Sequence, residues 1–274
     1  MELEGAKQPP YNTSLVGTVH GAAEVLGIDI STDDLFGGSG HAFVMNVHEE
    51  LCPSGPYCWD PGPFYALCRN IGINITDLGF FDAASSMDQR TRIEADVRDL
   101  LNRGVPCGVV NMDHQLIYGF DDHGFLLAEP WGPVETTPPR LSFETWAEFG
   151  RELHIEFFSI ERCDTADPKA TVIAALRFAK ELHDQPHRYT EEHYAMGAEA
   201  YENWLGAVRA GHAADHGSWW NGMVWGECRS QASAYLRGVA ERFPGAAEEA
   251  EEIAEVYARI GALLIEAADK ELGE

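Results

Sequence analysis

The sequence has few basic residues. Lys and Arg together number 19 against 45 Asp and Glu, which gives a formal net charge of −26. A surface this acidic repels the phosphates of nucleic acids and the headgroups of anionic lipids, so we expect neither a nucleic acid nor a membrane as a partner. It would instead attract cationic ligands, such as a basic peptide or a small amine-containing molecule.

Long apolar runs and paired cysteine motifs are also missing. The chain has no run of about 18 apolar residues and no signal peptide, so a membrane-spanning segment is not predicted. None of the six cysteines forms a Cys-x-x-Cys pair. Free thiols in a reducing cytoplasm are the simplest interpretation, and no cofactor is expected.

Histidine pairs with the spacing of metal ligands are present but incomplete. His183 and His187, and likewise His212 and His216, are four residues apart, as zinc ligands on a helix would be. However, Pro186 interrupts the first pair, glycines flank the second, and neither belongs to a His-Glu-x-x-His motif. We therefore expect no metal site.

Residues 1–165 hold most of the glycine and proline and several runs typical of strands. Asn12 or Thr13 is expected to cap a first helix that ends at Gly27. Apolar spacing predicts a second helix over 87–102, and Ser142 is expected to cap a short helix through Trp146. The predicted strands are 105–111, 114–120, 125–129 and 154–161, with a tight hairpin at 121–124. These elements together predict an α+β domain.

Residues 166–274 are rich in Ala, Glu and Leu and are predicted to be helical throughout. Asp167-Pro168 is a typical helix start, because Asp caps and Pro fits the first helical position. The predicted helices are 168–184, 190–209, 218–243 and 246–270. A four-helix bundle following the α+β domain is the simplest arrangement.

Two segments of the first half carry residues suited to acyl-group chemistry. Gln8 is followed six residues later by Ser14, which lies at the start of a predicted helix ending in Leu-Gly. His114 opens a predicted strand that runs into a Gly-Phe-Asp turn, and Glu129 precedes a proline on the next strand.

The order and spacing of these residues resemble the bacteriocin-processing peptidases, papain-like cysteine peptidases that remove double-glycine leaders. The resemblance covers most of residues 8–132 and implies a papain-like fold for residues 1–165. It also implies a role for each residue: Gln8 donates to the oxyanion, Ser14 replaces the nucleophilic cysteine, His114 is the general base and Glu129 orients it.

Serine in place of cysteine changes the chemistry that such a site can perform. A thiol begins near pKa 8.5, and a helix N-terminus with an imidazolium can hold it as thiolate. A hydroxyl begins far higher, and a helix terminus supplies at most about 2 kcal/mol. Ser14 can therefore react only by concerted general-base catalysis.

Three functions follow from this pattern. If active, the protein is an amide hydrolase or acyltransferase with a Ser-His-Glu arrangement. The second interpretation is a pseudoenzyme, an inactive relative that binds a peptide or cationic small molecule in the old active-site cleft. The third is an interaction protein without a functional cleft.

The two-domain layout and the segment Trp220–Arg229 are similar to a second family, the acyltransferases of butirosin biosynthesis. That family moves an aminoacyl group from a carrier protein to an aminoglycoside. The resemblance implies acyl transfer to an amine rather than to water, with a carrier protein as a further partner.

The remaining candidates surround this site or replace parts of it. The Gly-rich stretch 37–43 lacks the Gly-Lys-Ser/Thr ending of a phosphate-binding loop. We expect His41 and Phe43 in it, together with Trp131, to line the substrate cleft. Weaker alternatives are His48 as the base and Cys52 or Cys58 as a displaced nucleophile, although both cysteines also fit as small buried hydrophobes.

Overall fold

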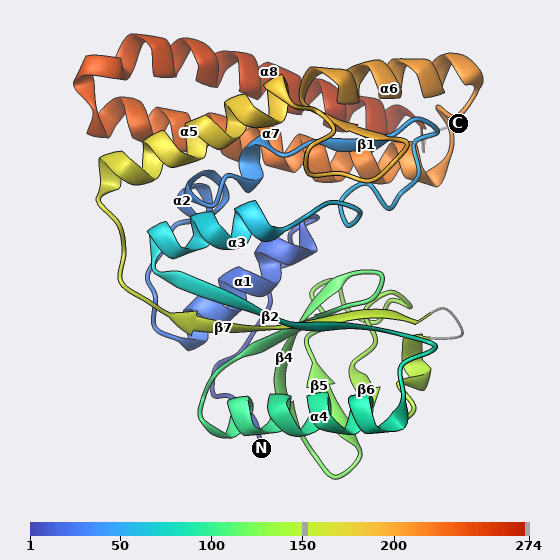
Figure 1. The fold of residues 1–274 in the computed structure, drawn as a ribbon. Coiled ribbons are helices and arrows are strands. Elements are labelled where there is room, and N and C mark those ends of the chain that lie inside the picture. The colour runs from blue at the N-terminus through green and yellow to red at the C-terminus, as the bar shows by residue number, and fades with distance from the viewer. Residues whose placement is uncertain (150–152, 272–274) are drawn as a thin grey trace. The chain divides into compact units, whose positions relative to one another are not determined.

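The structure is a computed structural model that describes residues 1–149 and 153–271 (Figure 1). The described residues form an α+β protein with eight α-helices, a six-stranded antiparallel sheet and a two-stranded sheet. Contacts divide the chain into two compact units. The first unit comprises residues 1–30 and 72–165, and the second comprises 31–71 and 166–274. The predicted α+β class is confirmed at this level.

The first unit is built on the six-stranded sheet, whose strand order is β2-β7-β3-β4-β5-β6. Helices α1 (Ser14–Val25) and α4 (Met87–Asn102) both contact β3 and β4, and Figure 1 shows them on opposite faces of the sheet. The strands are β2 (Ile73–Asp82), β3 (Cys107–Val110), β4 (His114–Phe120), β5 (Gly124–Leu127), β6 (Arg140–Ser142) and β7 (His154–Arg162).

The α4 face of the sheet carries the apolar core of this unit. Ile93, Val97 and Leu101 project from α4 at helical spacing and are buried in it. Ser86 and Gln89 form a complete capping box at the start of α4, which explains why the helix begins at the predicted residue. The sequence prediction missed β2, although Ile73 and Ile75 alternate inward there.

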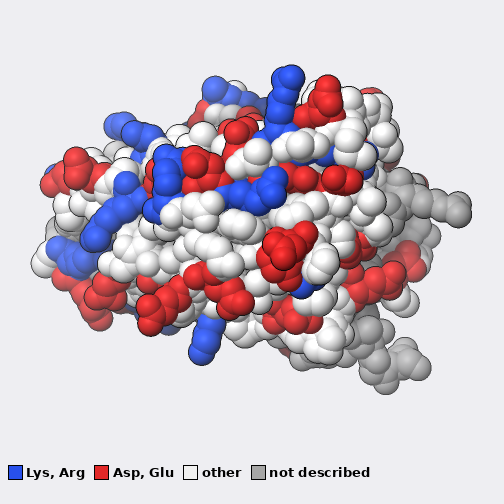
Figure 2. Space-filling model, turned by 90° about the horizontal axis from the view of Figure 1, so that it is seen from below, with Lys and Arg blue, Asp and Glu red and all other residues white. Residues whose placement is uncertain are grey.

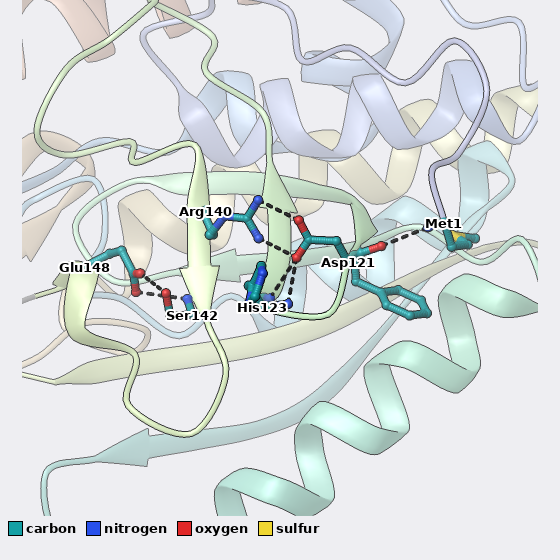
Figure 3. Close-up of polar contacts among 8 residues, drawn as sticks. Met1, Asp121, His123, Arg140, Ser142 and Glu148 are labelled. Atoms are coloured by element: carbon teal, nitrogen blue, oxygen red, sulfur yellow. Dashed lines mark hydrogen bonds and ion pairs between the residues drawn. The ribbon is translucent and has the colours of Figure 1, made fainter.

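The hairpin predicted at 121–124 is confirmed, since β4 and β5 pair antiparallel across it. Figure 3 shows Asp121 and Arg140 facing each other, joined by two hydrogen bonds of 2.5 and 2.7 Å. Asp121 also accepts hydrogen bonds from the backbone N–H groups of His123 and Gly124. The Arg140 guanidinium and the His123 amide hold the pKa of Asp121 well below its usual range.

The short helix predicted from Ser142 to Trp146 is wrong. Ser142 ends strand β6, and its hydroxyl and N–H both donate to the Glu148 carboxylate. The chain then turns through Glu144 and Trp146, whose φ angles are 67° and 49°. Trp146 is fully buried and donates to the buried Glu94 carboxylate at 2.9 Å. Pairing with β5 and burial of this ring outweigh a single helical turn that has little stability of its own.

The second unit contains the helices predicted for the C-terminal half and a segment that was not assigned to it. Predicted and observed bounds agree within a few residues, except that the helix expected from 190 begins at Gly197 because 194–196 form a strand. The elements are α2 (Thr32–Gly38), β1 (Asn46–His48), α3 (Gly62–Cys68), α5 (Pro168–Asp184), β8 (Tyr194–Met196), α6 (Gly197–Ala210), α7 (His216–Arg242) and α8 (Ala247–Glu271).

The observed division differs from the predicted boundary at residue 165, because residues 31–71 belong to the second unit. Strand β1 pairs with β8, and the Arg229 guanidinium of α7 donates to the carbonyls of Ala42 and Val44. A buried guanidinium requires such acceptors, so the segment is fixed to the helices by polar bonds as well as by packing. The unit is therefore larger than a four-helix bundle.

The described part of the chain contains no helix that is both long and apolar enough to cross a membrane. On the face seen in Figure 2, basic and acidic side chains are interspersed. This face therefore presents no uniform acidic field, although the chain as a whole is strongly acidic.

Candidate functional site

Ser14 and His114, separated by 100 residues in the sequence, meet in the first unit. Ser14 is the first residue of α1 and His114 the first residue of β4. The Ser14 Oγ lies 3.4 Å from the His114 Nδ1 and accepts a hydrogen bond of 3.1 Å from the His114 N–H. Both residues are buried, with 3% and 8% of their surface exposed. The structure thus brings together the predicted nucleophile and the predicted base.

Two glycines of α1 let the preceding segment lie close to this pair. A side chain at Gly17 would come within 2.9 Å of the Pro9 carbonyl, and one at Gly21 within 2.2 Å of the Lys7 carbonyl. Gly17 and Gly21 are four residues apart and therefore share one face of the helix. The close approach along this face places Gln8 against the start of α1.

The Gln8 side chain joins α1 to β4 through both ends of its amide. Its Nε2 donates to the His114 carbonyl at 2.9 Å and to the Ser14 carbonyl at 3.4 Å, and its Oε1 accepts from the Leu116 N–H at 2.8 Å. The Ser14 N–H donates to the Asn12 carbonyl at 3.1 Å. The Gln8 amide, to which the peptidase resemblance assigns the oxyanion, and the backbone N–H of the nucleophile Ser14 are therefore both bonded to backbone oxygens in this structure.

Glu129 is the residue that the peptidase resemblance assigns to orienting His114. The residue follows β5 and is exposed. Burial, with the charges of Glu2 and Glu129, raises the pKa of Tyr118. Trp131 follows in the same loop and is partly buried. The contacts described for this site are those of the Ser-His pair, and the orienting role of Glu129 stays a prediction.

His41 and Phe43, which were expected to line a cleft, lie in the core of the second unit. They are only 1% and 5% exposed. Burial lowers the pKa of His41 to about 3, so the imidazole is neutral, and its Nδ1 lies 3.6 Å from the Cys228 Sγ. The aromatic rings that meet His41 edge-on are Phe36, Trp59 and Phe64.

The alternative nucleophiles and the alternative base have structural partners in the second unit. The Cys52 Sγ and the Ser54 Oγ are 2.7 Å apart, and the Ser54 Oγ lies 2.7 Å from the Tyr194 Oη. Burial raises the pKa of the Cys58 thiol, which opposes formation of a nucleophilic thiolate. The His48 Nδ1 accepts a hydrogen bond from the Glu50 N–H at 3.0 Å.

A pocket of about 510 Å³ lies in the second unit, where the sequence indicated no site. Its histidines pair with carboxylates: the His193 Nδ1 lies 2.9 Å from the Glu49 Oε1, and the His187 Nε2 lies 3.0 Å from the Glu199 Oε2. The lining residues are Glu49, His187, Thr190, Glu191, Glu192, His193, Tyr194 and Asn203. The lining carries carboxylates but no Lys or Arg.

Two further residues beside the Ser-His pair were not predicted from the sequence. The Thr18 Oγ1 donates to the Ser14 carbonyl at 3.0 Å, and the carboxyl-bearing Asp113 next to His114 is buried. The spacing of Thr18, four residues after Ser14, is the signal that could have indicated a side chain bonding back within the first turn. Asp113 carried no comparable signal. Among the described residues, no group of three His, Cys, Asp or Glu side chains could hold a metal ion.

Neither a family model nor a curated protein matches this chain. The two family resemblances therefore remain predictions, and the function has to be argued from the geometry of the chain itself.

Proposed function

We propose that the protein is an acyl-transfer enzyme of papain-like type, a hydrolase or acyltransferase in which Ser14 is the nucleophile and His114 the general base. The observation that supports it is the 3.4 Å approach of the Ser14 Oγ to the His114 Nδ1. The placement of Ser14 at the start of α1, against the first residue of β4, agrees with the fold that the peptidase resemblance implies. Such a pair is the minimal unit of nucleophilic catalysis.

The reaction requires the imidazole tautomer that carries its proton on Nε2. Ser14 donates its hydroxyl proton to the Nδ1 of His114 as its Oγ attacks the carbonyl carbon of an amide or thioester. The imidazolium then returns this proton to the leaving amine or thiol, and an acyl ester on Ser14 remains. Water or an acceptor amine attacks the ester and releases Ser14. No residue beyond these two has to move a proton.

Acyl-ester trapping with p-nitrophenyl acetate tests this function. We expect one acetyl group per chain, located on Ser14 by peptide mass mapping and absent in Ser14→Ala. His114→Ala should slow the acetylation about 100-fold or more, because general-base catalysis contributes about 10²–10⁴. Ser54→Ala is the matched control. The Ser54 hydroxyl, like that of Ser14, is hydrogen-bonded to the side chain of another residue, here the Tyr194 hydroxyl, but it has no imidazole partner among the described residues and lies outside the Ser-His pair. Acetylation that persists in Ser14→Ala would exclude Ser14 as the nucleophile.

A second candidate function is binding without chemistry. The engagement of Gln8 and the Ser14 N–H by backbone oxygens favours it, because a tetrahedral intermediate would find neither donor available. The ligand would be a cationic small molecule or basic peptide. The pocket in the second unit, lined by three glutamates, offers such a ligand a place outside the Ser-His pair.

Titration calorimetry with spermidine tests the second candidate. We expect binding to weaken at least about tenfold in Glu49→Gln/Glu191→Gln/Glu192→Gln, since loss of even one charge-assisted hydrogen bond to a carboxylate costs about 1.5–3 kcal/mol. The triple substitution Glu248→Gln/Glu252→Gln/Glu255→Gln on α8 removes the same charge elsewhere and serves as the control. If both variants lost the same affinity for spermidine, binding would depend only on the net charge of the protein and not on this pocket.

A further inference from the structure

Helix α8 has two apolar stripes, and only one of them packs against the protein. The inner stripe packs on α7, with residues Ala250, Ala254, Leu264 and Ala268 buried. Glycines bring the two helices together: a side chain at Gly222 would come within 2.9 Å of the Ala268 Cβ. The contact with α7 is therefore complete without the other stripe.

The outer stripe consists of Ile253, Val256, Ile260 and Leu263. Ile253, Val256 and Leu263 are 48%, 55% and 58% exposed, and Ile260 is partly buried. The intervals of three, four and three residues are the a and d spacing of a coiled-coil seam. Scattered single apolar residues on a surface need no explanation, but an aligned row over three turns marks an interaction site.

The edge of this stripe is acidic. Glu248, Glu252 and Glu255 are all exposed and lie on the side of α8 away from the inner stripe, with Arg259 as the basic residue among them. A second copy of the chain would bring the same acidic edge against this one, and each copy carries a net charge of −26. Glu252 holds a flanking g position of the seam, and Glu248 and Glu255 lie beside it at c. Acidic side chains on a partner helix would oppose pairing with this edge, whereas Lys or Arg on the partner would favour it.

We propose that the outer stripe of α8 is a docking surface for an amphipathic helix of another protein, whose apolar a and d residues are flanked by Lys or Arg. The stripe extends over about 15 Å of helix, so it contacts only about three turns of such a partner. An interface this short is below the size of stable complexes, and the expected affinity is in the micromolar range. The partner is therefore bound transiently.

Fluorescence anisotropy with a labelled peptide of about 21 residues tests this inference. The peptide has Ile at a, Leu at d and Lys at e and g, and its like charges keep it from pairing with itself. We expect Val256→Ser/Leu263→Ser to weaken its binding about tenfold or more. Leu205→Ser/Val208→Ser removes similarly exposed apolar residues from α6, and should change binding less than about twofold.

Three results would overturn the proposal. The first would be equal binding of a peptide of the same composition with its heptads scrambled, because charge alone would then account for binding. The second would be an equal loss of affinity in the α6 and α8 variants. The third would be a dimer of the protein, seen by sedimentation and abolished in Val256→Ser/Leu263→Ser, because the occupant would then be a second copy. Circular dichroism of each variant checks whether these surface substitutions leave the helices intact.

Discussion

In Ser14→Cys, the new thiol should react with iodoacetamide down to about pH 6, with an apparent pKa about 2 units or more below the usual 8.5. The physical reason lies in the position of residue 14. It is the first residue of α1, where the helix dipole favours an anion, and its side-chain atom faces the His114 Nδ1. A thiolate-imidazolium pair forms there because a thiol, unlike a hydroxyl, starts close enough to neutral pH.

The measurement is the rate of alkylation against pH, followed by peptide mass mapping. None of the six native cysteines forms a disulfide in the structure, so the alkylation of the unsubstituted protein is measured in parallel and the peptide that carries residue 14 is followed separately. Combining Ser14→Cys with His114→Ala should return the apparent pKa to about 8.5 or above, because the partner charge is lost and burial remains. A low pKa that survives the loss of His114 would mean that the pair does not act as a unit. An apparent pKa at or above the usual 8.5 in Ser14→Cys itself would contradict the proposed Ser-His pair.

Local patterns predicted most helices and strands of this protein because local physics determines them. Helix α4 carries its capping box and apolar stripe within sixteen residues, and its bounds were predicted without error. Strand β4 and the hairpin after it follow from alternation and turn residues. Trp146 shows the opposite case, because burial of its ring against Glu94 depends on a residue 52 positions away.

The assignment of residues 31–71 to the second unit could not be predicted from neighbouring sequence. The bonds that fix this segment come from distant residues: Arg229 donates to the Ala42 carbonyl, and Asn203 donates to the Val47 carbonyl at 2.9 Å. Predicting His41 as a cleft residue failed for the same reason. The rings that enclose it and the Cys228 thiol beside it belong to elements that no local pattern connects.

The candidate site was predictable only in part. The spacing of Gln8 and Ser14, together with the position of His114, identified three residues that the fold does bring together. What spacing could not show is where each polar group points. The Gln8 amide bonds to backbone, and Glu129 is directed to solvent. Hydrogen-bond direction is set by the packing of α1 on β4, which no residue spacing encodes.

Gln8 is therefore expected to act as a positioning residue, and its removal should have the second large effect. In Gln8→Ala, the Leu116 N–H loses its acceptor and the His114 carbonyl loses its donor, both inside the protein. Each buried group left unsatisfied costs about 1–3 kcal/mol, so we expect the free energy of unfolding to fall by about 3 kcal/mol. Urea denaturation followed by circular dichroism measures this change.

Gln115 provides a control that separates positioning from stability. It is also a buried glutamine, and its Nε2 donates to the carbonyls of Ala128 and Pro138, so Gln115→Ala should destabilise the unit comparably. In the Ser14→Cys background, Gln8→Ala should also raise the apparent pKa of the introduced thiol toward 8.5, because α1 and β4 are no longer joined beside the pair. Gln115→Ala should leave that pKa unchanged. If both substitutions raised it equally, general loosening of the unit would explain the effect, and Gln8 would have no specific part in holding Ser14 against His114.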